Sequence, residues 1–139
     1  MNTRRIALPL LAAIGMTFAG ASVAADNPGD SVKPNFSHVI PNIPGKSLIA
    51  VEVSYPPGGA SMAHHHAHSA FIYAYVVSGS VVSQVEGQPE HTYHAGESFY
   101  EAPGAHHTVS RNASRTEPAK LLAVFVVNTD DNALTTFDK

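Results

Sequence analysis

Histidine dominates the residues of this chain that could do chemistry. The sequence has nine His beside eight Lys plus Arg, and it has no Cys. Histidine is the commonest metal ligand in proteins and the usual general acid or base near neutral pH. The absence of Cys excludes disulfides, thiolate catalysis and zinc–thiolate sites. A metal centre or an acid–base site built on imidazole is therefore the first chemistry to consider.

One short tract holds four of the imidazoles, at His64, His65, His66 and His68. Side chains on a β-strand point alternately to opposite faces, so His64 and His66 share a face, and His68 joins them only if the strand runs on. Two imidazoles spaced in this way can bind one metal ion. The alternative is a surface tract that binds metal weakly or not at all, and the tract by itself leaves both interpretations open.

A second pair, His106 and His107, follows later in the chain, just after the turn-forming Pro103–Gly104. A metal site in a β-barrel takes its ligands from separate strands, so the pair favours a metal site. Glu101 precedes the same turn and is a candidate acid or base if it points inwards. Glu101 or Glu97 is also a candidate carboxylate near the metal. The alternative for Glu101 is a solvated strand end.

The elements that must position these residues are predicted to be short strands. Apolar or alternating runs separated by Gly and Pro turns indicate strands, and no run predicts a helix. The runs are residues 47–55, 70–77, 81–86, 90–94, 97–101, 106–110 and 119–128. Their spacing is typical of an all-β sandwich or small barrel. The last run is too apolar for a strand with one wet face, so we expect it in the centre of a sheet.

The two ends of the chain differ from this central region. Residues 1–25 combine a basic start, an apolar stretch and small residues, which predicts a signal peptide and a periplasmic or secreted protein. Residues 26–46 are rich in Pro and are expected to form an extended arm. Residues 47–128 are expected to form the barrel, followed by a C-terminal tail, residues 129–139, that is loose at its end.

Composition and charge exclude several classes of function. The net charge is −3, which argues against nucleic-acid binding through a basic surface. Only 14% of residues are charged and 44% are hydrophobic, which excludes a disordered, highly charged chain. A length of 139 residues fits one domain. Beyond the predicted signal peptide, no apolar stretch is long enough to span a membrane.

The residues around both histidine groups resemble the two sequence motifs of the cupin family. The first consists of Gly58, His64, His66 and a strand that ends at Gly79. The second is residues 96–107, GESFYEAPGAHH, in which Gly opens a strand and a metal-binding His follows a Pro–Gly turn. The resemblance implies a small jelly-roll β-barrel with a metal ion at its mouth.

The resemblance also implies a ligand set. His64 and His66 would be the first two metal ligands and His107 the later one, with His68 and His106 as rivals. One divalent transition metal ion is expected, and imidazole ligands suit Fe, Mn, Ni, Cu and Zn alike.

One departure from the family pattern changes the expected site. Cupins usually carry a Glu ligand four or five residues after the second His, where this chain has Ala70 and Phe71. We therefore expect a three-His site that resembles the cysteine dioxygenase branch of cupins. Such a site leaves coordination positions free for a substrate or for O₂.

Two tyrosines are further candidates for the catalytic site. Tyr73 and Tyr75 share one face of the predicted strand 70–77. If that face lines the barrel, their hydroxyls would orient a ligand beside the metal; the alternative is that both rings belong to the core.

These residues leave three functions open. The first is a metal-dependent dioxygenase or related oxidoreductase that acts on a small molecule. The second is a non-catalytic cupin that binds a metal or a small ligand. The third is a metal-buffering protein that uses the exposed imidazoles of His65, His68, His91 and His94. A homodimer is also expected, because the apolar strand and the Pro-rich arm are able to pair with a second copy.

Overall fold

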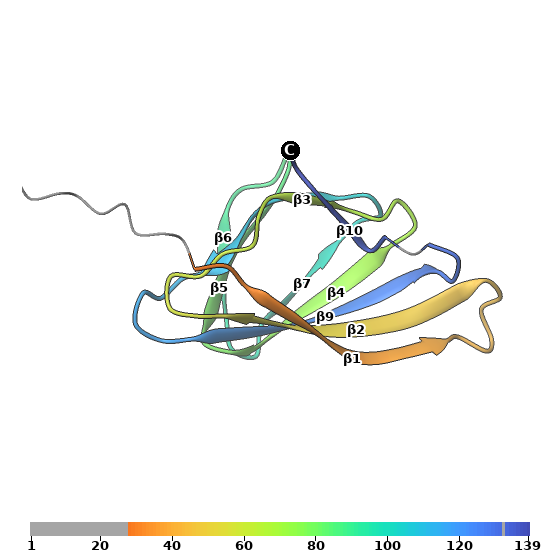
Figure 1. Ribbon diagram of the computed structural model, residues 1–139, viewed down its shortest axis with the longest axis horizontal. Coiled ribbons are helices and arrows are strands. Elements are labelled where there is room, and N and C mark those ends of the chain that lie inside the picture. Colours follow the sequence, from red (N-terminus) through yellow and green to blue (C-terminus); the bar gives the residue numbers. More distant parts are fainter. Residues whose placement is uncertain (1–27, 132) are drawn as a thin grey trace, which may run out of the picture.

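The computed structural model describes residues 28–131 and 133–139 (Figure 1). The predicted signal peptide lies outside the described residues. The described strands are β1 Ser31–Val39, β2 Lys46–Tyr55, β3 His64–His66, β4 Phe71–Ser78, β5 Ser80–Val85, β6 His91–His94, β7 Ser98–Glu101, β8 His106–Asn112, β9 Ala119–Asn128 and β10 Thr135–Phe137. In the described ranges there is no helix with the length and hydropathy to cross a membrane.

The strands form two five-stranded antiparallel sheets (Figure 1). The first sheet has the order β1-β2-β9-β4-β7, and the second has the order β10-β3-β8-β5-β6. This arrangement confirms the predicted all-β fold class. The two sheets together bury the side chains that alternate inwards along each strand.

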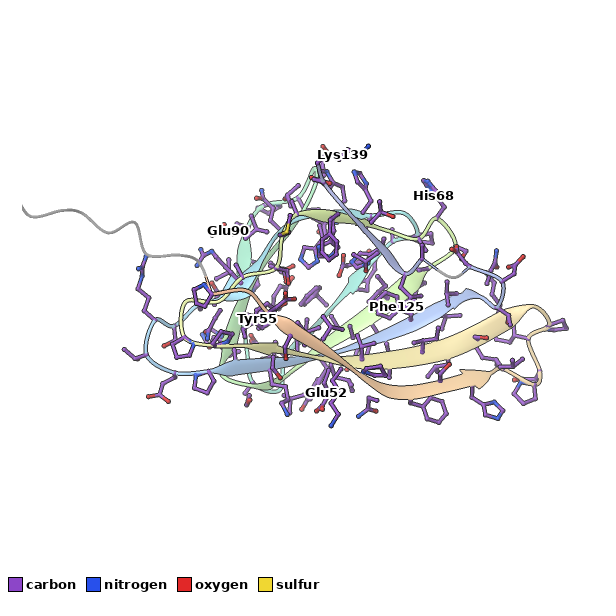
Figure 2. The ribbon with its side chains drawn as sticks, in the orientation of Figure 1. Glu52, Tyr55, His68, Glu90, Phe125 and Lys139 are labelled. Atoms are coloured by element: carbon purple, nitrogen blue, oxygen red, sulfur yellow. The ribbon has the colours of Figure 1, made fainter. Side chains whose placement is uncertain are left out.

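The core is built around β9, which lies between β2 and β4 in the first sheet, as its apolar composition predicted. Its burial alternates along the strand. The inward side chains of Leu121, Ala123 and Phe125 are buried, together with Ile72 and others of β4. Figure 2 shows Phe125 between the two sheets.

The Pro-rich arm is an edge strand. All nine residues of β1 are exposed, and among the described strands β1 pairs with β2 alone. The register shifts between Pro34 and Phe36. Pro cannot donate a ladder hydrogen bond, so it is tolerated at an edge and at an irregularity of this kind.

The C-terminal tail is more ordered than the sequence predicted. Thr135–Phe137 forms β10, which pairs antiparallel with β3. The amide of Asp138 donates a hydrogen bond to the Ala63 carbonyl at 3.0 Å. A strand of three residues is too short to show an alternating pattern, so no local pattern predicts β10.

Candidate metal centre

Three imidazoles converge between the sheets. His64 and His66 come from β3, and His107 comes from β8, directly opposite His64 in the antiparallel register. One ring nitrogen from each lies within 4.8 Å of the others. The three residues are only 7%, 8% and 3% exposed. The structure therefore brings together the three residues that the sequence proposed as ligands.

Strand alternation also settles which histidines stay outside this group. His65 and His106 project from the opposite face of the second sheet, and they are paired with each other in the register. β3 ends at His66, and His68 is exposed and points away from the body of the protein (Figure 2). Neither rival, His106 nor His68, belongs to this group.

Glu101 faces the imidazoles from the opposite sheet. It is the last residue of β7 and is only 4% exposed. Its Oε2 atom lies 3.0 Å from His66 Nε2 and 3.4 Å from His107 Nδ1. Glu97, the other carboxylate considered, is exposed and instead pairs with His94. Glu101 therefore points inwards, which is one of the two orientations that the sequence left open.

Two hydrogen bonds orient the rings. His64 Nδ1 lies 2.7 Å from the Met62 carbonyl oxygen, to which it donates, so its Nε2 keeps a lone pair. His107 Nε2 lies 2.8 Å from Ser83 Oγ, and a hydrogen on Nε2 leaves the Nδ1 lone pair facing Glu101. Partners of this kind commonly fix the orientation and tautomer of metal-binding histidines.

The donor atoms in the centre lack the partners that buried polar atoms require. Both ring nitrogens of His66 and Oε2 of Glu101 are buried without a hydrogen-bond partner among the described residues, despite the short distance between them. Leaving such a group unpaired costs about 1–3 kcal/mol. Ligands bound about 2.1 Å from a shared ion, at tetrahedral to octahedral angles, lie about 3.0–3.4 Å apart. The two Glu101 distances match that separation, so the donor set fits a divalent metal ion.

The electrostatics of the site favour the protonation states that metal binding needs. Burial lowers the pKa of His107 to about 4 and also lowers the pKa of His64. Burial alone would raise the pKa of Glu101, but the neighbouring His66 and His107 outweigh it and lower that pKa. Neutral imidazoles beside an ionised carboxylate are the form that coordinates a metal.

A cavity of about 260 Å³ adjoins these residues. His64, His66, Glu101 and His107 lie in its wall, and most of the remaining wall is apolar. The other strand residues in the wall include Val51, Val53, Ile72, Leu121, Ala123, Phe125 and Phe137. Pockets for small ligands commonly combine such walls with a few polar groups.

Five polar side chains of the wall were not singled out by the sequence: Asp30, Tyr55, Ser61, Ser110 and Thr135. Tyr55 Oη lies 2.7 Å from Ser110 Oγ, and Ser61 Oγ donates to Asp30 Oδ2 at 2.5 Å. Burial raises the pKa of Tyr55. Tyr55 ends an alternating strand, and its place in that alternation is the only signal that could have placed it inside.

Tyr73 and Tyr75 lie on the outer face of β4 and do not line the cavity, so the condition for their proposed role is not met. Tyr73 is 45% exposed and Tyr75 is on the same outer face of β4, whereas Ile72 and Ala74 face inwards. Both faces of this strand are apolar, so periodicity separates the faces without showing which one is buried.

Comparison with known families decides the identity of the fold. The cupin-domain family model matches residues 51–125, which is more than half of the chain. This chain belongs to the cupin family. The match includes both histidine groups and Glu101, so the centre of this cupin lies inside the matched region. A search of curated proteins found no match.

Solved structures with a similar fold support the same assignment. A cupin-family protein with a double-stranded β-helix fold from Methanocaldococcus jannaschii is 15% identical, with a TM-score of 0.57, over 82% of this chain and 94% of that one. An oxalate oxidase in complex with glycolate is 22% identical, with a TM-score of 0.59, over 82% and 57%. A DMSP lyase from Ruegeria pomeroyi is 19% identical, with a TM-score of 0.57, over 88% and 59%. This cupin therefore spans less than two thirds of the length of the oxidase and the lyase.

Proposed function

We propose that this cupin binds one divalent transition metal ion through His64, His66 and His107, with Glu101 as a fourth donor. The observation that carries the proposal is the set of buried, unpartnered donor atoms on His66 and Glu101. An ion between the two residues would satisfy Glu101 Oε2 and one ring nitrogen of His66 together. This ligand set extends the three-His site expected from the sequence by one carboxylate, which comes from the second motif instead of the first.

We further propose that the metal-binding residues act on a small, largely apolar molecule held in the adjoining cavity. A bound divalent ion would supply Lewis acidity and an open coordination position. The apolar walls exclude water around the ligand, and the Tyr55–Ser110 pair offers hydroxyls to a polar group on it. The reaction class we propose is an oxidation of the dioxygenase type. The similar folds include an oxidase and a lyase, so the fold alone does not select the reaction.

The test is metal content followed by turnover. Untagged protein is dialysed, and its metals are measured by elemental analysis, for the wild type and for His64→Ala and His66→Ala. We expect each variant to hold one ion fewer per chain than the wild type, because the inner centre is lost. His68 lies outside the proposed donor set, so His68→Ala is the matched control and should keep the ion. Full metal retention in His66→Ala would remove the ligand assignment.

A second function is favoured by one observation. Once Glu101 binds the metal, the remaining carboxylate of the cavity, Asp30, is engaged by Ser61. Among the described residues, the wall then offers no carboxylate without a partner, which favours a cupin that binds a metal-coordinated ligand without converting it. Oxygen uptake by the metal-loaded protein with candidate substrates separates the two functions. Tight ligand binding without product favours the binding protein.

The metal-buffering function has less support. Of the four exposed imidazoles proposed for it, His65 belongs to one of the two groups of metal-ligating side chains found among the described residues, whereas His68, His91 and His94 belong to neither. A buffer would bind several ions per chain through these exposed imidazoles. The elemental analysis above also tests this function, because substitution of His91 and His94 would then lower the metal content.

Export and dimerisation remain part of the proposal. Residues 1–25 have the composition of a signal peptide, so we propose a periplasmic or secreted protein. Amino-terminal sequencing of the protein from its own cells tests cleavage after Ala25. The exposed edge strand β1 supports a homodimer formed through that edge. Light scattering of the purified protein tests it, and a monomeric mass would contradict it.

A further inference from the structure

A second group of metal-ligating side chains lies on the outer face of the second sheet. His65 of β3, His106 of β8 and Asp138, which follows β10, each offer a donor atom within 4.8 Å of the others. His106 Nε2 lies 2.8 Å from Asp138 Oδ2, and His65 Nε2 lies 3.9 Å from Asp138 Oδ1. A further carboxylate, that of Glu86, lies 3.6 Å from His106 Nδ1. We call His65, His106 and Asp138 the outer cluster.

The outer cluster is the reverse side of the inner centre. His64 pairs with His107 across the β3–β8 ladder, and the next pair is His65 with His106. Successive side chains alternate faces, so one pair of strands presents two imidazoles inwards and two outwards. The outward rings are stacked, with centroids 4.0 Å apart and planes 11° apart. Their nitrogens therefore approach the same carboxylate.

The chemistry of this cluster suits a transition ion. Two imidazole nitrogens and one carboxylate oxygen form a common donor set for Zn²⁺ and its neighbours, and water can complete the coordination at an exposed site. We propose that the outer cluster is a second metal site, distinct from the inner one, and that an ion bound there fixes β10 against the sheet. This proposal does not depend on the function proposed for the inner centre.

The attachment of β10 explains why such an ion would matter. β10 is three residues long and pairs only with β3, which is equally short. Thr135 and Phe137 of β10 nevertheless form part of the wall of the inner cavity, and the Phe137 ring contacts His64 at a centroid distance of 6.0 Å. An ion bound by the outer cluster would link Asp138, the residue after β10, to His65 on β3 and His106 on β8. It would therefore hold one wall of the cavity in place.

The first experiment counts zinc ions. Full-length protein is titrated with Zn²⁺ at pH 7.5 by calorimetry and after dialysis. We expect two ions per chain in the wild type and one in Asp138→Ala and in His106→Gln. Loss of one partner that only orients a ligand lowers metal affinity about 10–100-fold, so loss of a ligand should weaken the second site at least about 100-fold. The double variant His91→Ala/His94→Ala is the control and should keep both ions.

The second experiment measures hydrogen exchange at the β10 amides with and without zinc. We expect zinc to slow exchange at residues 135–137 in the wild type and to lose that effect in Asp138→Ala, whose inner site is still loaded. Asp138 is exposed near the end of the chain, so this variant should fold. The proposal is overturned if the cluster variants still bind two ions, if the wild type binds only one, or if zinc protects β10 equally in Asp138→Ala.

Discussion

Glu101 Oε2 lies 3.0 Å from His66 Nε2, yet neither atom has a hydrogen-bond partner among the described residues. The two atoms come from opposite sheets, since Glu101 ends β7 and His66 ends β3. Two ligands of one ion lie at about this separation, which supports the proposed role of Glu101 as a fourth donor. In the proposed ligand set, the two sheets must therefore pack against each other to bring Glu101 to the imidazoles.

Replacement of Glu101 by Gln tests the role of its carboxylate. The amide keeps the shape of the side chain but loses the charge, so a ligand role predicts at least about a 100-fold loss of metal affinity. Competition with a chelator measures this affinity. The exposed Glu97→Gln is the matched control and should bind metal as the wild type does. A Glu101→Gln variant that keeps its metal and loses only turnover would instead make Glu101 an acid or base.

The stability of the metal-free protein should fall between pH 6.5 and pH 4. Burial lowers the pKa of His107 from 6.5 to about 4, so in this range the unfolded chain takes up a proton that the folded chain does not. The contribution of His107 is therefore fully present above pH 6.5 and is lost as the pH falls to 4. The loss is about 3 kcal/mol in the free energy of unfolding. The lowered pKa values of His64 and Glu101 act in the same direction.

Urea denaturation of the metal-free protein at several pH values measures this effect. The His107→Gln variant has no titrating group at this position, so its stability should fall less over the same range. His106 provides a contrast: its hydrogen bond with Asp138 raises the pKa, so its contribution is present below pH 6.5 and is lost as the pH rises through the raised value. Equal pH dependence in the wild type and in His107→Gln would contradict the prediction.

Much of the site could be predicted because strand alternation is a strong constraint. The spacing of His64 and His66 placed both on one face, and the second motif supplied a histidine from another strand. The choice between His106 and His107 needed the register, because a shift by one residue exchanges the two faces of β8. The sequence contained both candidates but not the pairing of His64 with His107.

The errors have an equally physical origin. Tyr73 is a site candidate only if its face of β4 lines the barrel, and because both faces are apolar, the pattern does not show that Ile72 is the inward residue. The roles of Phe137 and Asp138 were missed because they depend on a three-residue strand that forms only by pairing with another short one. Contacts of this kind, between segments far apart in the chain, leave no local pattern.

The hydroxyl pair between Tyr55 and Ser110 should stabilise the fold next to the cavity. Tyr55 of β2 and Ser110 of β8 join the two sheets through a buried hydrogen bond of 2.7 Å. Tyr55→Phe leaves the Ser110 hydroxyl without this partner, which should cost about 1–2 kcal/mol in the free energy of unfolding. Removal of both hydroxyls in Tyr55→Phe/Ser110→Ala should cost less than the sum of the two single changes. Urea denaturation of the four proteins gives this coupling, and strict additivity would contradict it.

Among the glycines in turns, Gly79 should tolerate a side chain least well. It is the single residue between β4 and β5, where the chain crosses from one sheet to the other. Its φ is +71°, and a Cβ there would lie 2.6 Å from the Pro118 carbonyl oxygen. Gly87 has a φ of +81° with nothing within 4 Å of its Cβ position. A substitution at Gly87 therefore measures the cost of the positive φ alone, without the collision that a Cβ would make at Gly79.

Gly87→Ala should lower the free energy of unfolding by about 1 kcal/mol, because Ala is strained at positive φ. Gly79→Ala should lower it by about 3 kcal/mol, because the backbone of Pro118 and Ala119 cannot move aside without disturbing the start of β9. Thermal and urea denaturation of both variants measure the difference. Since β5 carries Ser83, which orients His107, Gly79→Ala should also weaken metal binding, whereas Gly87→Ala should not. Equal stability of the two variants would show that the crossing tolerates a side chain.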